Sequence, residues 1–212
     1  QSVQDSVALI VGFVRDARSG EAAQGISVTG EWLEMTLGKS GISNHVEHLV
    51  ATTGANGWFA MCNVPGGGSM TLMASRGADS TDVIEVSVPM SGFVRRELFL
   101  GSSHVALREA SSSVSRVRTG DGQLSGVVVR LADGKPLAGA DVTISDGQET
   151  KANERGEWTL ADIPGRTRML EVRALGFYPD RRRVDVVAGA PPVRIALSTL
   201  KSVLDTVKVT AS

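Results

Sequence analysis

The residues best suited to chemistry lie in the run His45-Val-Glu-His48, since histidine and glutamate are common zinc ligands. In a zinc-binding His-Glu-x-x-His helix the two histidines are four residues apart and share a face. Here His45 and His48 are three residues apart, so the spacing does not match. We interpret the run as the solvated tip of an insertion, with a metal shared with a partner as the alternative. The sequence itself predicts no metal site.

Two further patterns resemble catalytic motifs only in part. Gly38-Lys39-Ser40 ends like a phosphate-binding loop, but Leu33 stands where such a loop has its first glycine. There is no Gly-x-Ser-x-Gly nucleophile motif. A Ser-His-Asp triad would have to draw on the three histidines of the chain, which are His45, His48 and His104. We therefore predict no catalytic residues, no cofactor and no enzyme activity.

The composition is that of a globular protein: 212 residues, 42% hydrophobic, 21% charged, with a formal net charge of −1. This charge balance is far from that of nucleic-acid-binding proteins, so no nucleic acid is expected as a partner. No apolar run approaches the roughly 20 residues that cross a bilayer as a helix. Cys62 is the single cysteine, which excludes an intramolecular disulfide, and we expect it to be a small buried hydrophobic residue.

The chain starts at Gln1, without an initiator methionine or a cleavable apolar segment. This start is typical of a mature exported protein whose signal peptide has been removed, or of a trimmed chain. We therefore expect a periplasmic or other extracytoplasmic location, peripheral to a membrane.

An internal repeat sets the architecture. The stretch from Gly12 to Val28 aligns with the stretch from Gly126 to Val142 at an offset of 114 residues. Further along, residues 57–95 align with residues 156–194 at an offset of 99 residues. The difference of 15 residues predicts an insertion in the first copy, within about residues 30–50.

Each copy reads as a series of short strands. Gly126-Val-Val-Val-Arg130 is an apolar run, Asp133-Gly-Lys-Pro-Leu-Ala-Gly139 is a turn, and Ala140-Asp-Val-Thr-Ile-Ser145 alternates with period two. Seven such strands in about 90 residues predict an all-β fold of two Greek-key sandwiches in tandem. The expected domains are residues 1–100 with the insertion, a Ser-rich linker over 101–122, a second sandwich over 123–198 and an extended tail over 199–212.

The second copy carries a family resemblance. The pattern formed by Gly134-Lys-Pro-Leu-Ala-Gly-Ala-Asp-Val142, Asn153-Glu-Arg-Gly-Glu-Trp-Thr-Leu-Ala-Asp-Ile-Pro-Gly165 and Val172-Arg-Ala-Leu-Gly-Phe177 resembles the carboxypeptidase regulatory-like domain. The resemblance implies a transthyretin-like (prealbumin-like) β-sandwich and runs from Leu124 to Leu197. The first copy departs from the pattern, with Glu21-Ala-Ala23 in place of Lys-Pro-Leu and with the insertion.

Several residues read as determinants of this fold. Phe59 and Trp158 occupy matching positions where an inward side chain would fill the sandwich. We expect a positive φ or a close approach at Gly25 and Gly139, and a type II turn at Pro164-Gly165.

Three stretches are candidate partner-binding surfaces. The insertion is apolar for a free loop and contains Trp32, Leu33 and Met35, which either cover their own sandwich or enter a partner. A run of three arginines lies near three further ones, Arg166, Arg168 and Arg173. This cluster is either an ordinary solvated sheet face or a basic patch that faces acidic lipid headgroups or an acidic protein surface. Exposed aromatics of the kind used in interfaces precede this run. The residues concerned are Phe177, Tyr178, Arg181, Arg182 and Arg183.

The C-terminal tail adds a fourth candidate. Because the second copy is complete at Leu197, the residues after it are additional to the sandwich. The run Asp205-Thr206-Val207-Lys-Val209-Thr-Ala211 resembles the Ton box of TonB-dependent outer-membrane receptors. Such an extended segment could join the sheet of a partner by β-augmentation.

These features favour a non-catalytic extracytoplasmic scaffold that docks on an integral membrane-protein complex, with an extrinsic subunit of a photosynthetic reaction-centre and antenna assembly as one instance. An alternative is the N-terminal periplasmic region of a TonB-dependent receptor, in contact with the outer-membrane receptor machinery. A carbohydrate- or peptide-binding accessory module is the third possibility, although no aromatic platform is evident in the sequence.

Overall fold

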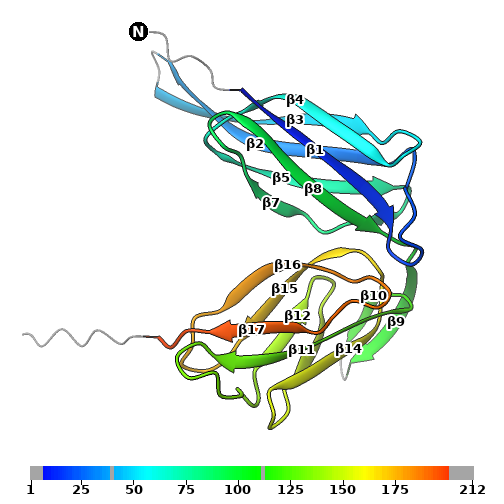
Figure 1. Cartoon of the computed structure of the whole chain (residues 1–212), viewed down its shortest axis with the longest axis vertical. Coiled ribbons are helices and arrows are strands. Elements are labelled where there is room, and N and C mark those ends of the chain that lie inside the picture. The colour runs from blue at the N-terminus through cyan, green and yellow to red at the C-terminus, as the bar shows by residue number, and fades with distance from the viewer. Residues whose placement is uncertain (1–6, 39–40, 111–112, 201–212) are drawn as a thin grey trace, which may run out of the picture.

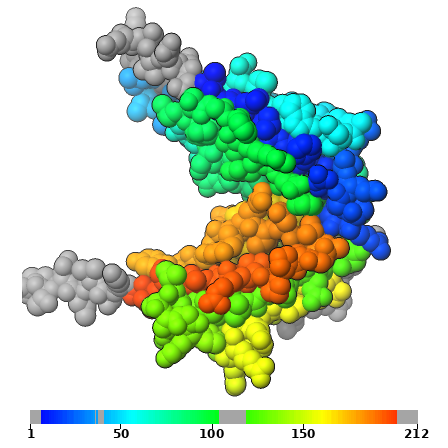
Figure 2. Space-filling view, viewed as in Figure 1, coloured from blue at the N-terminus to red at the C-terminus, as the bar shows by residue number. Residues whose placement is uncertain are grey.

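The computed structural model describes residues 7–38, 41–110 and 113–200, and these residues form strands and turns without any helix. Two β-sandwiches follow one another along the chain and are linked on one side by a short hairpin (Figure 1). The space-filling view shows the two sandwiches in contact near this link and separated by a notch on the opposite side (Figure 2). Within the described ranges, the chain therefore has no helix that could span a membrane.

The first sandwich contains eight strands in two sheets. One sheet has the order β4-β1-β8, with β1 and β8 parallel; the other contains β3, β2 and β5 in that order, with β6 and β7 both pairing with β5. The strands are β1 (Val7–Asp16), β2 (Ser27–Gly38), β3 (Gly41–Thr52), β4 (Trp58–Pro65), β5 (Ser69–Arg76), β6 (Asp79–Ser80), β7 (Ile84–Ser87) and β8 (Gly92–Leu100).

The second sandwich repeats this plan with seven strands. Its sheets have the orders β14-β11-β17 and β13-β12-β15-β16, and β11 and β17 are parallel like β1 and β8. The strands are β11 (Gly122–Arg130), β12 (Asp141–Ile144), β13 (Gln148–Lys151), β14 (Glu157–Ile163), β15 (Thr167–Arg173), β16 (Asp180–Asp185) and β17 (Val193–Leu197). The predicted all-β fold of tandem sandwiches is therefore confirmed.

Each core is centred on an aromatic ring that lies over a glycine. Phe59 is 1% exposed and stands opposite Gly12 in the sheet register, while Trp158 is 3% exposed and stands opposite Gly126. A β-carbon on Gly12 would come within 2.7 Å of the Phe59 ring, and one on Gly126 within 2.6 Å of the Trp158 ring. The prediction that these two aromatics fill the sandwiches is confirmed.

One expectation for the turns is correct and one is wrong, and the expectation for Cys62 in β4 is also wrong. Gly25 and Gly139 both have a φ of +71°, as predicted from their turn positions. Gly165 is not among the glycines with positive φ, so the type II turn is wrong; this glycine instead allows close packing on Ala17 of the first sandwich, 3.2 Å from where its β-carbon would be. Cys62 is exposed rather than buried, since it lies on the outward face of β4.

The insertion and the linker both contain strands. In the first copy, β2 and β3 form one long hairpin, whereas the matching β12 and β13 turn back at Asp146-Gly147 after four residues each. The Ser-rich segment 101–122 contains a second hairpin, in which β9 (His104–Ala110) pairs with β10 (Ser113–Thr119). This hairpin is fastened to the second sandwich by a hydrogen bond from the Gly120 N–H to the Asp162 carbonyl at 3.1 Å.

Candidate interaction surface

The long β2–β3 hairpin extends beyond its own sandwich. The pairing of β2 with β5 ends at Glu31 opposite Thr71, whereas the pairing of β2 with β3 continues to Gly38 opposite Gly41. From Trp32 onwards the two strands therefore pair only with each other. We call residues 31–48 the arm.

The two faces of the arm differ sharply. In a strand, alternate side chains point to opposite faces. Val28 is fully buried and Trp32 packs against the first core, so even-numbered residues of β2 face inward and odd-numbered residues face outward. The β3 residues that lie opposite the odd-numbered residues of β2 share this outward face. The large exposed apolar side chains of this hairpin, all on the outward face, are Leu33 (57% exposed), Met35 (70%), Leu37 (83%), Ile42 (72%), Val46 (68%) and Val50 (58%).

The outward face is therefore largely apolar, although Glu31, Asn44 and His48 also lie on it. Leu33 lies directly opposite Val46, and Leu37 lies directly opposite Ile42, so their β-carbons are about 5 Å apart. A hairpin that served only as a solvated loop would carry polar residues on its free face. Leu33 and Met35 are thus exposed together on the outward face, whereas Trp32 packs against its own sandwich. Partner binding by these three residues stays a prediction.

The run His45-Val-Glu-His48 does not gather its ionisable groups in one place. Because β3 is a strand, His45 and Glu47 point to the inward face of the arm and His48 to the outward face. Across the parts of the chain that the structure describes, no three His, Cys, Asp or Glu side chains come together as metal ligands. The predicted solvated tip is a strand with both faces exposed.

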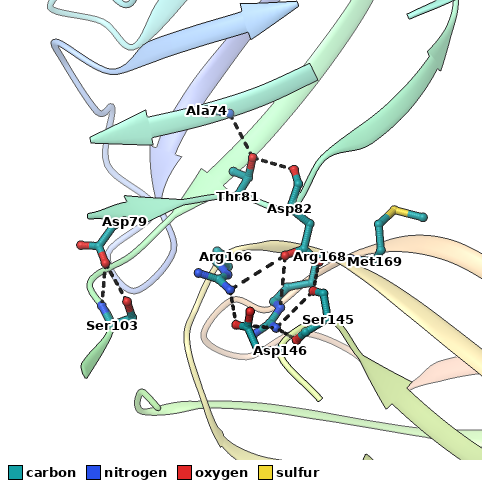
Figure 3. Close-up of polar contacts among 10 residues, drawn as sticks. All are labelled: Ala74, Asp79, Thr81, Asp82, Ser103, Ser145, Asp146, Arg166, Arg168 and Met169. Atoms are coloured by element: carbon teal, nitrogen blue, oxygen red, sulfur yellow. Dashed lines mark hydrogen bonds and ion pairs between the residues drawn. The ribbon is translucent and has the colours of Figure 1, made fainter. Parts of the chain in front are cut away.

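The junction between the sandwiches contains two of the six arginines of the expected cluster. Arg166 and Arg168 are 3% and 0% exposed, and Asp82 from the first sandwich reaches both (Figure 3). The Asp82 carboxylate accepts a hydrogen bond from the Met169 N–H at 2.6 Å and one from the Ser145 hydroxyl, and lies 3.8 Å from Arg168 Nε and 3.9 Å from Arg166 Nη2. The Asp82 side chain, which comes from the first sandwich, is thus largely buried against residues of the second.

A second carboxylate completes this junction. Asp146 Oδ2 lies 2.5 Å from Arg166 Nη2 and 3.1 Å from Arg168 Nη2, so two carboxylates balance two guanidinium groups. Burial and the neighbouring Arg166 charge lower the pKa of Arg168, while the two aspartates oppose the shift. Thr167 adds neutral contacts: its hydroxyl accepts from the Phe99 N–H at 2.8 Å, and its carbonyl accepts from the Asp82 N–H at 3.1 Å.

The remaining arginines do not form one basic surface. Arg182 binds Asp180 through two hydrogen bonds of 2.6 Å, which raise its pKa. Arg183 donates to the Glu97 carbonyl of the first sandwich at 3.1 Å and to Asp185 at 3.3 Å. Arg173 pairs with Glu171. Arg166 and Arg168 are therefore buried at the junction, whereas Arg181 and Arg183 are exposed and Arg182 is half-buried. A role of Arg181, Arg182 and Arg183 in partner binding stays a prediction.

The two predicted aromatics next to this run differ in exposure. Phe177 is partly buried against the second core and forms an isolated bridge with Thr199. Tyr178 is 51% exposed, and its N–H donates to the Ser198 carbonyl at 2.9 Å. Tyr178 is thus available to a partner, whereas Phe177 serves mainly to fasten the end of the second sandwich. Asp205, Thr206, Val207 and Val209 lie outside the described residues.

The structure also brings together aromatics that the sequence did not connect. On the outer face of the β4-β1-β8 sheet, Phe13 lies directly opposite Trp58, which is 43% exposed, while Phe93 on β8, 67% exposed, lies on the same face but beside Leu9, four residues along β1 from Phe13. The Arg95 guanidinium lies over the Phe13 ring at 5.4 Å from its centroid. Only the register of three strands reveals this grouping, because these residues are distant in sequence.

A pocket of about 920 Å³ opens at the junction on the side of the linking hairpin. Its lining is rich in glycine and backbone groups, with Asp16, Arg18 and Asp121 as its charged side chains. Burial raises the pKa of Asp16, but hydrogen bonds from the N–H groups of Ser19 and Arg18 outweigh this effect and lower it. Asp16 therefore acts as a turn-capping carboxylate rather than as a proton donor.

The fold and this surface define a tandem β-sandwich protein with an exposed apolar arm. Residues 123–198, which include nearly all of β11 and every later strand to β17, match the family model of the carboxypeptidase regulatory-like domain. Domains of this family are non-catalytic and are typically found outside the cytoplasm. The matched residues comprise the second sandwich. The first sandwich is related to it by the internal repeat.

Comparisons with other proteins add little about function. No curated protein matches the chain. One similar solved structure is the Bacillus anthracis TIE protein, with 16% sequence identity, a TM-score of 0.32, and a match that covers 92% of this chain and 34% of that one. Another is a streptococcal ancillary pilin, with 11% identity, a TM-score of 0.32, and a match that covers 93% of this chain and 64% of that one. A third is the Streptococcus agalactiae minor pilin GBS52, with 13% identity, a TM-score of 0.33, and a match that covers 97% of this chain and 100% of that one. The chain spans about a third of the length of the first and less than two thirds of the second. At these TM-scores the overlays carry no inference about function.

Proposed function

We propose that this protein is a non-catalytic extracytoplasmic scaffold that docks on an integral membrane-protein complex through the outward face of its arm. The observation that carries the proposal is the row of exposed apolar side chains on that face, from Leu33 to Val50. Exposed apolar surface of this extent is typical of interaction sites. The family match over residues 123–198 supports the non-catalytic and extracytoplasmic parts of the proposal.

The charge of the arm favours a protein partner over an anionic lipid surface. The arm carries Glu31, Glu34 and Glu47 against Lys39 as its only lysine or arginine. An acidic ribbon is repelled by acidic headgroups, whereas an apolar protein surface accepts its outward face. The buried junction holds the two sandwiches together, so the second sandwich extends the scaffold away from the docking site.

The test is capture from native membranes that have been washed with salt. We expect the protein to retain an integral membrane protein that mass spectrometry identifies, and the variant L33T/M35T/L37T to retain it at least about 10-fold less, since each buried apolar side chain contributes about 1.5 kcal/mol or more. Threonine keeps the strand propensity of these exposed positions. The matched control is L131T/L175T, which removes two exposed leucines of the second sandwich. Equal capture by both variants would contradict the proposal.

A photosynthetic reaction-centre and antenna assembly is the specific partner that we propose within this class. The same capture experiment, performed on membranes of a photosynthetic bacterium, tests it directly. Recovery of reaction-centre subunits supports the assignment, and recovery of an unrelated membrane complex replaces it.

A TonB-dependent receptor is the second candidate, and the sequence of residues 205–211 favours it. In this candidate the tail pairs with a sheet edge of TonB. Titration of the full chain with the TonB C-terminal domain should then show binding that the deletion of residues 202–212 abolishes. Binding that survives this deletion would argue against the tail.

An accessory role in carbohydrate or peptide binding is the third candidate, and the pair of Phe13 and Trp58 on the outer sheet face favours it. Aromatic side chains on an exposed sheet face offer flat apolar surfaces to a ligand. A glycan array should then give signals that Trp58→Ala removes, and an array without signals would exclude the glycan form of this candidate.

A further inference from the structure

Strand β3 is an edge strand along its whole length. It pairs with β2 from Gly41 to Thr52, and on its other side it pairs with no strand of the described chain. Edge strands usually carry lysine, proline or a bulge that prevents them from pairing with other chains. The sequence of β3, GISNHVEHLVAT, contains neither lysine nor proline, and its register with β2 is regular; its one carboxylate is Glu47, which the pairing described below places opposite a histidine. The edge is therefore suited to pairing.

The register shows which backbone groups face this edge. The Thr53 N–H donates to the Ile26 carbonyl at 2.9 Å next to the Ser27–Thr52 pair, so Thr53 belongs to a hydrogen-bonded pair, and such pairs alternate along an antiparallel ladder. The β3 residues that alternate with the hydrogen-bonded ones direct their N–H and C=O groups away from β2. On β3 the residues that present these groups to the free edge are Ile42, Asn44, Val46, His48 and Val50.

The sequence around Val46 is complementary to itself when read in the opposite direction. If Val46 lies opposite Val46 of a second copy, Ile42 meets Val50, Asn44 meets His48, and His45 meets Glu47. Ile42 and Val50 then form apolar pairs, Asn44 and His48 can hydrogen-bond, and an imidazole faces a carboxylate twice, while Ser43 opposite Leu49 is the one mismatched pair within residues 42–50. Centring the pair on His48 instead would place Glu47 opposite Leu49, and centring it on Glu47 would place His45 opposite Leu49.

We propose that two copies of this protein associate through antiparallel pairing of their β3 strands, with the two-fold axis at Val46. This inference is independent of the docking partner proposed above. The residues with outward backbone groups supply the inter-chain hydrogen bonds. His45 and Glu47 of opposite copies form non-hydrogen-bonded pairs, whose α-carbons are about 4.5 Å apart, so an imidazole N–H can donate to the carboxylate.

The geometry of the arm suits this arrangement. The first sandwich lies at the Thr52 end of β3 and the arm extends away from it, so in the pair the two sandwiches lie at opposite ends of the paired strands. Every side chain that faces outward on one arm stays on the same side of the combined sheet as its counterpart. The apolar surface from Leu33 to Val50 is thereby doubled in area and remains available.

Sedimentation of the full chain tests the proposal. We expect a dimer to form as the protein concentration is raised to about 1 mM, and we expect the variant Val46→Pro to stay a monomer over the same range. Proline removes only the N–H that faces the free edge, so the β2–β3 hairpin should stay intact, which the thermal unfolding midpoint verifies. A wild-type monomer, or a folded Val46→Pro variant that remains a dimer, would overturn the proposal.

A mixing experiment tests the register itself. His45→Glu places two glutamates opposite each other in both pairs, and Glu47→Lys places lysine opposite histidine, so each variant alone should dimerise about 10-fold or more weakly. In a mixture, the introduced glutamate of one copy meets the introduced lysine of the other, and the unchanged Glu47 meets the unchanged His45. The mixture should therefore form a heterodimer. Folding damage in either variant could not produce this recovery, and a mixture that stays monomeric would overturn the proposed register.

Discussion

The two sandwiches share a hydrogen-bond framework and differ at their margins. Val14 N–H donates to the Gly57 carbonyl at 2.8 Å, and Val128 N–H donates to the Gly156 carbonyl at 2.8 Å. The first sandwich adds the arm and the Asp82 side chain, while the second adds the buried arginines that receive Asp82. The two copies thus share their core and differ in their contact surfaces. Asp82 of the first copy and the buried arginines of the second form the junction, and only the first copy has an arm that faces outward.

The largest effect should come from emptying either core. Phe59→Ala and Trp158→Ala each remove a large ring that packs over a glycine, and each should lower the free energy of unfolding by about 3–5 kcal/mol. Urea denaturation followed by circular dichroism measures the loss. If the two cores are equivalent, the losses should be similar. A loss in only one of them would contradict this equivalence.

The junction should be the next most sensitive part. Asp82→Ala leaves Arg166 and Arg168 buried with Asp146 as their one remaining carboxylate, and we expect it to lower the free energy of unfolding by about 3 kcal/mol. Asp146→Ala should cost less, because its side chain is 29% exposed and Asp82 remains. Small-angle X-ray scattering should show a wider separation of the two sandwiches in Asp82→Ala. An unchanged scattering profile would show that Asp82 does not hold them together.

A smaller and equal effect is expected at the matched turns. Gly25 and Gly139 both have a φ of +71°, and no atom lies within 4 Å of the position that a β-carbon would occupy. Alanine at either position therefore costs only the left-handed backbone conformation, about 1–2 kcal/mol. Thermal unfolding of both variants checks this expectation, and a large difference between them would show that the two turns are not equivalent.

The sequence predicted those features that the chain encodes locally. Period-two alternation and turn glycines located the strands, and the offset of 114 residues paired Gly12 with Gly126 from spacing alone. The change of offset also located the extra residues of the first copy. Their structure was missed because the serine and histidine content of residues 39–48 resembles a loop, although Leu33, Met35 and Leu37 alternate as they do in a strand.

The junction could not be predicted in this way. Arg166 and Arg168 read as surface arginines, because their carboxylate partner Asp82 lies more than 80 positions earlier in another domain. The formal charges alone do not reveal which arginines will be buried. A partial signal existed in Gly165, whose missing side chain permits the close approach of Ala17.

The smallest effect on stability should come from converting the first hairpin into the second. Replacement of residues 31–48 by Ser-Asp-Gly, the turn that joins β12 to β13, removes 15 residues and keeps the register of the remaining strands. Apart from Glu31, which also pairs with Thr71 of β5, the lost strand residues pair only with one another, and Trp32 is the one residue among them that packs against the core as a partly buried side chain. The free energy of unfolding should therefore fall by about 1 kcal/mol, as urea denaturation would show. The same variant should lose both membrane capture and self-association, because both depend on the arm. If it retained them, the difference between the two sandwiches would have to lie elsewhere than in this hairpin.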